Sequence, residues 1–312
     1  MSDFPLQLLV FWLAIVFDLL LGEPPNAVHP VAWLGRIIGA FQRIAPQQGR
    51  WKPLVIGTLF VIVGATALAA AGFLMQWVLS ACSAPVAVLG EALALKLTFS
   101  IRGLARAGFQ VQSALKSADI SSARRLLSWH LVSRNTSSLD ESQVAAATIE
   151  SLSENASDSY VAPFLCFALG GLPGAFVYRF INTCDAMLGY RDAQREWLGK
   201  TAARFDDLLN LIPSRITAIL IIASGVLVGR NPARALHVWL RDRKLTASPN
   251  AGHPMSATAG VLGIELEKIG HYRLGGGQPK PTYIDIGRAQ SLLACTALLA
   301  IAATSAILLA IE

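Results

Sequence analysis

Long apolar stretches separated by short polar segments dominate the chain. About 20 consecutive apolar residues are needed for a helix to cross a bilayer. The second and last of the apolar runs meet that length without a charged residue. The runs lie at about Pro5–Leu21, Pro53–Leu79, Pro85–Leu104, Tyr160–Ile181, Leu208–Val228 and Ala289–Ile311. This pattern predicts an all-α, polytopic helical membrane protein with four to six spans.

The remaining runs carry charged or helix-breaking residues. Asp18 lies in the first run, Glu91 and Lys96 lie in the third, and Arg215 lies in the fifth. The fourth contains "GGLPG" (170–174), which should interrupt a helix. Irregular backbone at membrane depth is tolerated where protein buries it or where it lines a cavity. We therefore expect a broken or re-entrant helix at this point.

Two regions are more polar than the rest. Residues 102–158 show helical spacing of apolar positions with polar faces, and Ser137 or Ser138 could begin a helix there. Residues 248–285 are rich in Gly and Pro, and we expect a long loop with one short helix near Met255–Leu262. No linker divides the sequence, so we predict a single integral membrane domain over residues 1–312.

Composition and charge support a membrane protein. Hydrophobic residues make up 54% of the chain and charged residues 15%, whereas soluble domains carry about 25% charged residues. The net charge of +6 comes largely from short loops between apolar runs, which is typical of contact with anionic lipid. We therefore expect the protein to contact membrane lipid and to act on an anionic substrate, and we do not expect it to bind nucleic acid. "MSDFPLQ" lacks the positive charge of a secretory signal.

Three carboxylates precede the fourth apolar run in "ESLSENASDSYVAPF". Glu150, Glu154 and Asp158 are four residues apart, so a helix would place them on one face. A solvated helix face is one interpretation. Carboxylates at the edge of a membrane segment are costly, however, and oxygen ligands suit Mg²⁺ together with a phosphate. Asn155 could add a ligand, and Glu154 and Asp158 are our candidates for the metal.

Further polar residues lie at the ends of apolar runs. Asn182 and Asp185 follow the fourth run, where they could be ordinary polar residues at the end of a helix. Arg204, Asp206 and Asp207 precede the fifth, where Arg204 and Asp207 could form an ordinary salt bridge.

Arg215 lies inside the fifth run and could bind a phosphate or carboxylate. In "SPNAGHP", Ser248, Asn250 and Gly252 could present donors to an anion or merely form a turn. His29, before Pro30, could bind substrate or serve a structural role. The chain contains no Walker A sequence, G-x-G-x-x-G or G-x-S-x-G.

These stretches, in this order, resemble the cobalamin biosynthesis protein family CbiB/CobD. The resemblance extends from about residue 18 to about residue 289. It is carried by "DLLLGEPPNAVHPVAWLGR", "SRNTSSLDE", "ESLSENASDSYVAPFLCFALGGLPGAFVYRFINTCDAMLGY", "ARFDDLLNLIPSR" and "SPNAGHPMSATAGVLGIELE".

The resemblance implies a multipass inner-membrane enzyme, adenosylcobinamide-phosphate synthase. Such an enzyme joins a carboxylate of adenosylcobyric acid, its corrinoid substrate, to the amine of aminopropanol phosphate or a related amino-alcohol phosphate. It consumes ATP and uses Mg²⁺, and activation as an acyl phosphate is the chemistry expected of a ligase. Other corrinoid-pathway enzymes and a second copy of the chain are conceivable partners.

On this resemblance, the candidate catalytic residues are Glu150, Glu154, Asp158, Asp206 and Asp207. The candidates for substrate or phosphate binding are Arg204, Arg215, Asn155, Asn182, Asp185, Ser248, Asn250, Gly252 and His29. The motifs themselves assign positions rather than individual roles. Glu150, Glu154 and Asp158 match "E-S-L-x-E-N-x-x-D", Asp206 and Asp207 match "R-x-D-D", and Ser248, Asn250 and Gly252 match "S-P-N-x-G". Two positions depart from the pattern. Asn135 stands where the resemblance implies Asp, and Met255 stands where it implies an acidic residue.

Two other functions remain open. One is a regulatory or sensor membrane protein of the AmpE type, without synthetase activity. The other is a transporter, which would also need charged residues and broken helices within the membrane. The blocks "SENASD", "NTCDAM" and "SPNAG" favour the synthase, and the long polar segment 248–285 disfavours a transporter.

Overall fold

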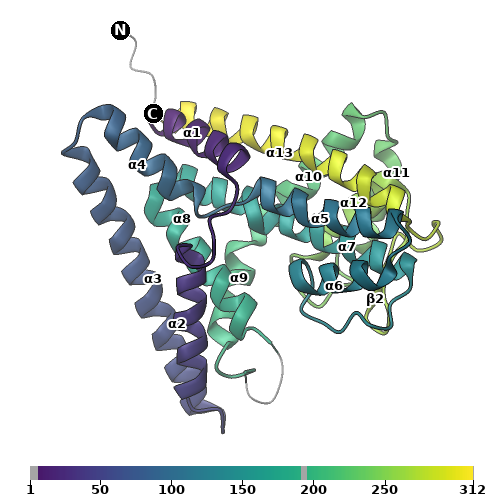
Figure 1. Cartoon of the computed structure of the whole chain (residues 1–312), viewed down its shortest axis with the longest axis horizontal. Helices are drawn as coiled ribbons and strands as arrows, with labels where there is room; N and C mark the ends of the chain where they lie inside the picture. Colours follow the sequence, from purple (N-terminus) through teal and green to yellow (C-terminus); the bar gives the residue numbers. More distant parts are fainter. Residues whose placement is uncertain (1–5, 191–194, 312) are drawn as a thin grey trace. The chain divides into compact units, whose positions relative to one another are not determined.

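A computed structural model describes residues 6–190 and 195–311, and their regular structure is helical apart from two strands of three residues each (Figure 1). Pro5 at the start of the first apolar run, most of "MSDFPLQ" and Arg191 lie outside the described residues. The contacts divide the chain into two compact units, each built from discontinuous segments. The prediction of one integral membrane domain stays a prediction.

The first unit contains residues 6–100, 162–190, 195–209 and 303–311. Its helices are α1 (Leu6–Leu21), α2 (Pro30–Ile44), α3 (Trp51–Ser80), α4 (Ala84–Lys96), α8 (Ala162–Leu188) and α9 (Lys200–Leu209). The second unit contains residues 101–161 and 210–302. Its elements are α5 (Ile101–Lys116), α6 (Ile120–His130), α7 (Glu141–Ala156), the π-helical turn η1 (Ser157–Val161), α10 (Leu211–Leu227), α11 (Pro232–Asp242), α12 (Gly252–Leu262), β1 (Leu266–Lys268), β2 (Tyr272–Leu274) and most of α13 (Tyr283–Ile311).

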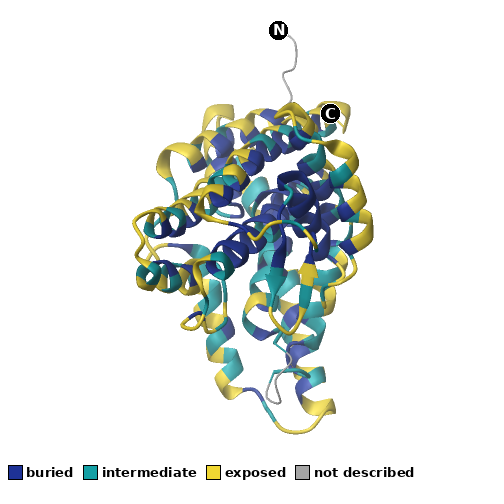
Figure 2. Cartoon of the chain, turned by 90° about the vertical axis from the view of Figure 1, so that its right-hand side faces the viewer, coloured by how far each residue is buried: buried dark blue, intermediate teal, exposed yellow. Residues whose placement is uncertain are grey.

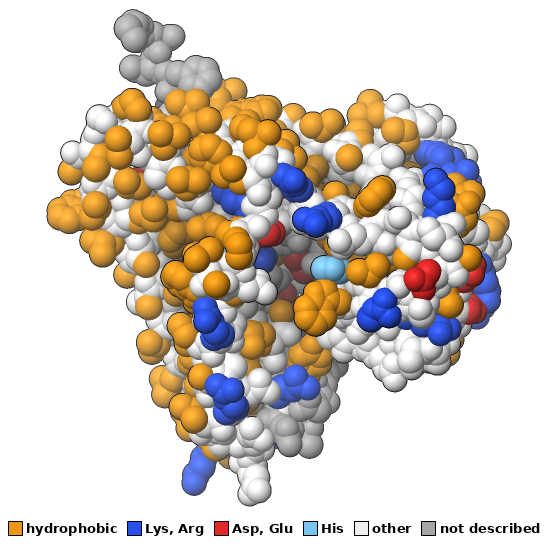
Figure 3. Space-filling view, viewed as in Figure 1, with side chains coloured by type: hydrophobic (Ala, Val, Ile, Leu, Met, Phe, Trp, Pro, Cys, Tyr) orange, Lys and Arg blue, Asp and Glu red, His pale blue; other side chains and the backbone are white. Residues whose placement is uncertain are grey.

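The helices confirm an all-α membrane protein. Four are long and apolar enough to span a bilayer, in continuous segments Trp51–Ser80, Ala84–Lys116, Glu141–Leu188 and Tyr283–Ile311. A fifth span results if α9 and α10, which are joined at a bend, cross together. Only 11% of the most apolar part of α3 is buried, and hydrophobic side chains cover much of the visible surface (Figure 3). Exposed apolar surface of this extent is expected for contact with lipid.

The predicted break in the fourth run is confirmed. Within α8, Gly171 has φ 58° and ψ −153°, values that lie outside the helical region, and Pro173 follows it. Close packing of α3 against α8 also depends on glycine. A Cβ at Gly72 would lie 2.7 Å from the backbone of Pro173. Glycine therefore lets the two backbones approach at the point where α8 is broken.

The core of the second unit is α12, whose residues are all buried. It packs against α7, α10 and α11. Figure 2 shows the buried residues of the chain in dark blue, with the exposed residues around them in yellow. Ser153 on α7 donates a hydrogen bond to Thr258 on α12, with 2.9 Å between the hydroxyl oxygens. Arg234 on α11 donates to the carbonyl oxygens of Gly260 and Val261. These bonds satisfy polar groups that the apolar surroundings would otherwise leave unpaired.

Two local predictions were wrong. The N-cap of α7 is Asp140, not Ser137 or Ser138. The Asp140 carboxylate accepts from the Gln143 N–H, and the Gln143 side chain accepts from the Asp140 N–H. This reciprocal capping satisfies two donors at the helix start. In the segment 248–285, the predicted short helix is confirmed as α12, but part of the expected loop forms the antiparallel hairpin β1–β2.

Candidate functional site

Glu150 is the most deeply placed of the three carboxylates in the second unit. It lies on α7 with 5% of its surface exposed, and one oxygen lies 3.9 Å from the Arg134 guanidinium. Lys268 contributes a further positive charge, and the Tyr272 hydroxyl interacts with the same carboxylate. A buried carboxylate is stable only with such partners, so the strands of the hairpin complete the surroundings of α7.

The hairpin brings Tyr272 to the acidic face of α7. Lys268 and Tyr272 are paired across its two strands, and β1 packs against α7. Burial, together with the negative charges of Glu150 and Glu154, raises the pKa of the Tyr272 hydroxyl. Its proton is therefore retained at neutral pH and is available as a hydrogen-bond donor to a carboxylate. Tyr272 and Lys268 were not among the predicted site residues, because the segment that forms the hairpin was expected to be loop.

Asp158 lies where the helix changes its geometry. The segment Ser157–Val161 forms a π-helical turn between α7 and α8, so Asp158 does not continue the regular α-helical stacking expected after Glu150 and Glu154. Such turns occur frequently at functional sites. Asn155 donates from its amide to the Ser151 carbonyl oxygen at 2.9 Å, which fixes its side chain against α7.

Arg215 and the "SPNAG" segment meet in the second unit, although 35 residues separate them. Arg215 donates to the Asn250 side-chain oxygen at 3.1 Å, and Ser214 donates to the same oxygen at 3.3 Å. The Asn250 N–H in turn donates to the Ser248 hydroxyl at 3.2 Å. The predicted phosphate-binding residues of two motifs therefore form one hydrogen-bonded group.

Two neighbours add to this group. A Cβ at Gly252 would lie 2.3 Å from the Arg243 carbonyl oxygen, so glycine is required for the chain to turn into α12. His253 accepts a hydrogen bond from the Trp239 indole. Burial, with the positive charges of Arg215 and Arg243, lowers the pKa of His253 to about 4. His253 is neutral at physiological pH, and the positive charge here comes from the arginines.

A separate charged cluster lies in the first unit. The Lys96 ammonium is 3.3 Å from a Glu23 oxygen and 3.8 Å from an Asp18 oxygen. Lys96 and Asp18 are almost completely buried. Neither Lys96 nor Glu23 was among the predicted site residues, and the signal for Lys96 was a charge within an apolar run.

His29 belongs to the same cluster and has both ring nitrogens occupied. Its Nδ1 accepts from the Val31 N–H at 3.1 Å, so the proton resides on Nε2, which donates to Glu23 at 2.6 Å. Burial acts to raise the pKa of Glu23, but the hydrogen bonds from His29 and Ser100 and the charge of Lys96 lower it to about 2. These contacts give His29 a structural role in capping α2, while its predicted role in substrate binding stays a prediction.

The remaining predicted residues also lie in the first unit. Asn182 on α8 donates to the Asp206 carboxylate on α9 at 3.2 Å, which joins "NTCDAM" to "ARFDD". Asp185 lies at the end of α8, where its backbone carbonyl accepts from the Gly189 N–H. On α9, Asp207 is half-buried, whereas Arg204 is exposed. The structure therefore places Asn182 and Asp206 in contact, while their predicted roles in a site stay predictions.

Within the described part of the chain, no three or more His, Cys, Asp and Glu side chains form a cluster that could hold a metal ion. Mg²⁺ commonly binds through one or two carboxylates together with substrate phosphates. Glu154 and Asp158 have the ligand chemistry for that arrangement.

Comparison with known proteins identifies the family. The family model described as "CobD/Cbib protein" matches residues 11–300. The chain belongs to the CobD/CbiB family. A relative from Dehalococcoides mccartyi, named cobalamin biosynthesis protein CobD, is 42% identical over 86% of each chain. Relatives named probable cobalamin biosynthesis protein CobD are 41% identical in Methanothermobacter thermautotrophicus, over 85% of this chain and 86% of the relative, and 39% identical in Pyrococcus abyssi, over 90% of each.

No solved structure matches the chain. The resemblance noted in the sequence is confirmed by the family match, and it places the chain among proteins of cobalamin biosynthesis. The motifs that carried the resemblance supply residues to all four polar groups described above, two in each unit.

Proposed function

We propose that this protein is an ATP-dependent ligase that forms adenosylcobinamide phosphate. It joins a carboxylate of adenosylcobyric acid to the amine of aminopropanol phosphate or a related amino-alcohol phosphate. The observation that supports this most strongly is the family match over residues 11–300. The presence of the acidic and phosphate-binding motifs in the expected order adds to it.

The reaction needs an activated carboxylate, because a carboxylate and an amine do not condense unaided in water. A corrinoid carboxylate oxygen attacks the γ-phosphorus of ATP, which forms an acyl phosphate and releases ADP. The amine then attacks the acyl carbon, loses a proton and expels inorganic phosphate as the amide forms. The protein must therefore hold anionic phosphates, orient the amine and accept its proton.

The residues of the second unit have the chemistry for these tasks. Arg215, oriented by Asn250, can bind a phosphate by charge-assisted hydrogen bonds. Glu154 and Asp158 can attract the ammonium form of the substrate or accept the proton that the amine loses. The protonated Tyr272 faces the acidic pair Glu150 and Glu154 and can keep the carboxylates oriented.

Glu154 and Asp158 are also the residues that would hold Mg²⁺. Their carboxylates fit this hard cation, which needs few protein ligands when phosphates complete its coordination. When bound, Mg²⁺ neutralises negative charge on the phosphates. The apolar spans and the cytoplasmic source of ATP support a location in the cell inner membrane.

The proposal is tested by reconstituting the purified protein with both substrates, Mg²⁺ and ATP, and detecting the amide by mass spectrometry. We expect Glu154→Gln to lose at least about 100-fold in kcat, in line with the loss of a positioned acid–base group. Glu141→Gln is the matched control, because Glu141 is exposed in the first turn of the same helix. Equal activity of the Glu154 and Glu141 variants would remove Glu154 from the site. Substrate movement across liposomes without ATP use would favour a transporter.

A further inference from the structure

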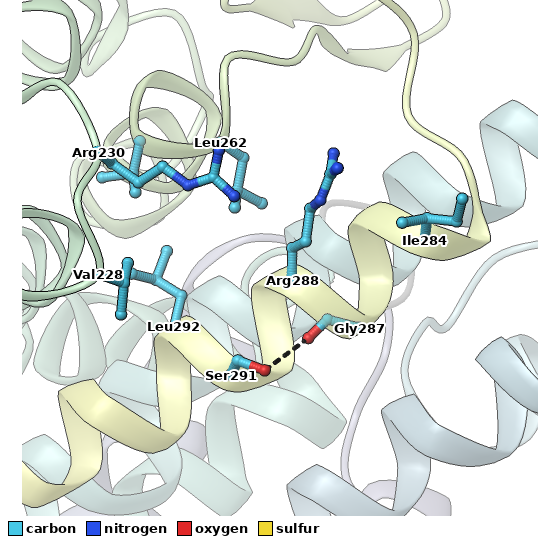
Figure 4. Close-up of a pocket in the computed structure, with 9 residues that line it drawn as sticks. Val228, Arg230, Leu262, Ile284, Gly287, Arg288, Ser291 and Leu292 are labelled. Atoms are coloured by element: carbon cyan, nitrogen blue, oxygen red, sulfur yellow. Dashed lines mark hydrogen bonds between the residues drawn. The ribbon is translucent and has the colours of Figure 1, made fainter.

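A cavity of about 450 Å³ lies in the second unit, and none of the predicted site residues lines it (Figure 4). Its walls come from the segment that follows α10, the end of α12 and the first turns of α13. Val228, Val261, Leu262 and Leu292 provide apolar surface, whereas Arg230 and Arg288 provide charge. None of the described residues that line it is acidic. Its volume lies in the range of small-molecule sites, roughly 300–1,000 Å³.

A buried hydrogen bond between α10 and α13 fixes one wall of the cavity. The hydroxyls of Ser224 and Thr296 lie 3.1 Å apart, and both residues are fully or almost fully buried. Val228 is one helical turn after Ser224, and Leu292 is one turn before Thr296. These two apolar residues therefore lie one turn from the hydrogen bond, on the side of the cavity.

Each arginine reaches the cavity from a different segment. Arg288 donates to the Asp285 carboxylate at 2.9 Å, and the other oxygen of Asp285 accepts from the Thr282 N–H at 2.9 Å. This chain of bonds orients Arg288 and uses only part of its guanidinium, which has five N–H donors. In Figure 4, Arg230 extends toward Leu262 while Arg288 rises from α13 into the same open space.

Both arginines also lie at the polar ends of apolar segments. The sequence has no Asp, Glu, Lys or Arg between Ala289 and Ile311, and none between Ile216 and Gly229. Arg288 and Arg230 are therefore the first charges beyond two stretches suited to the bilayer interior. Basic pockets between membrane helices are suited to anionic lipid head groups.

We propose that this cavity binds an anionic phospholipid. The lipid phosphate lies between Arg230 and Arg288, and the beginning of an acyl chain lies along Val228 and Leu292. A free phosphate would use the same two arginines. It would gain nothing from the apolar wall, however, and this difference separates the two ligands by experiment.

The test measures lipid binding to the full-length protein in a neutral detergent. Dioleoyl phosphatidylglycerol and dioleoyl phosphatidylcholine are titrated, and bound lipid is counted by native mass spectrometry. We expect phosphatidylglycerol to bind more tightly, and the double variant Arg230→Gln/Arg288→Gln to weaken its binding roughly tenfold or more. Arg43→Gln, at an exposed arginine in the last turn of α2, should bind as the wild type does. Unchanged binding by a folded double variant would overturn the proposal.

A second variant tests the apolar part of the site. Ser291 lines the cavity and is exposed, so Ser291→Phe should fill the space without disturbing the fold or either arginine. We expect this variant to lose phosphatidylglycerol. If instead it binds lipid normally, and soluble glycerol phosphate displaces lipid from the wild type at similar concentrations, the site binds a free phosphate and the lipid proposal is wrong.

Discussion

Replacing Lys96 by methionine should destabilise the first unit strongly. The ammonium lies 3.3 Å from Glu23 and 3.8 Å from Asp18, and 4% of the lysine side chain and none of the Asp18 side chain is exposed. Methionine keeps the length and apolar stem of lysine, so the change removes charge with little change in packing. Glu23 keeps its hydrogen bond from His29, whereas Asp18 is left as a buried carboxylate without its cation.

The magnitude follows from the burial of the pair. Removing one partner of a buried ion pair costs roughly 3–5 kcal/mol, because the remaining charge stays desolvated. At about 2–4 °C per kcal/mol, the melting temperature should fall by roughly 6–20 °C. The companion change Asp18→Asn should restore most of that loss in the double variant, because it removes the carboxylate that Lys96→Met leaves behind.

The assay follows the thermal unfolding of the detergent-purified protein for the wild type, both single variants and the double variant. Lys52→Met is the matched control, since Lys52 is exposed in the first turn of α3, and it should change the free energy of unfolding by less than about 0.5 kcal/mol. Two results would show that Lys96 and Asp18 do not act as a buried ion pair. One is a melting temperature for Lys96→Met equal to that of Lys52→Met. The other is a double variant in which Asp18→Asn lowers the melting temperature further instead of restoring it.

Three further predictions concern packing, pH and substrate binding. Gly72→Ala should lower the free energy of unfolding by about 1–3 kcal/mol, because its Cβ would lie 2.7 Å from the backbone of Pro173. Gly170→Ala should leave the free energy of unfolding unchanged, because its Cβ would meet nothing within 4 Å. Equal losses of stability for the two variants in chemical denaturation would contradict the close approach of α3 and α8 at Gly72. The free energy of unfolding should fall as the pH drops from about 6.5 to about 4. In this range His253 is protonated in the unfolded chain but stays neutral in the folded protein, where its pKa is lowered to about 4. His253→Asn should flatten this part of the pH–stability curve, and an unchanged curve would contradict the assignment. Arg215→Lys should raise KM for the amino-alcohol phosphate or ATP roughly tenfold, because lysine lacks the planar fork; steady-state kinetics with an unchanged KM for both would remove Arg215 from phosphate binding.

Features governed by local sequence were predicted most successfully. Apolar run length gave the long helices, and "GGLPG" gave the break, because Gly171 and Pro173 act through their own backbone geometry. The start of α7 was misplaced by a few residues. Asp140 competes with Ser137 and Ser138 for the capping position, and it prevails because Gln143 lies three residues later and completes a capping box.

Features that depend on distant residues were missed. The strands of the hairpin are three residues each, too short for an alternating pattern to distinguish them from loop. Tyr272 reaches Glu150 only because β1 packs against α7. Lys96 likewise lies 73 to 78 residues along the chain from Glu23 and Asp18, so its pairing could not be read from spacing.

The motifs predicted which residues are candidates for the site, but they did not predict which of those residues contact one another. The motifs named Arg215 and Asn250 separately, and the fold joined them through a hydrogen bond at 3.1 Å. The same is true of Asn182 and Asp206, at 3.2 Å. The π-helical turn at Asp158 was not predicted, since its i to i+5 bonding has no simple sequence signal.

The measurement that tests the proposed reaction most directly uses adenosylcobyric acid whose reacting carboxylate carries ¹⁸O. The reconstituted wild-type protein is given this substrate, aminopropanol phosphate, Mg²⁺ and ATP, and the amide and inorganic phosphate are analysed by mass spectrometry. Activation as an acyl phosphate predicts an amide product that requires ATP, and one ¹⁸O atom in the phosphate released with it. Failure of the folded protein to form any amide would contradict the proposed function, and amide formed with unlabelled phosphate would contradict the acyl-phosphate route.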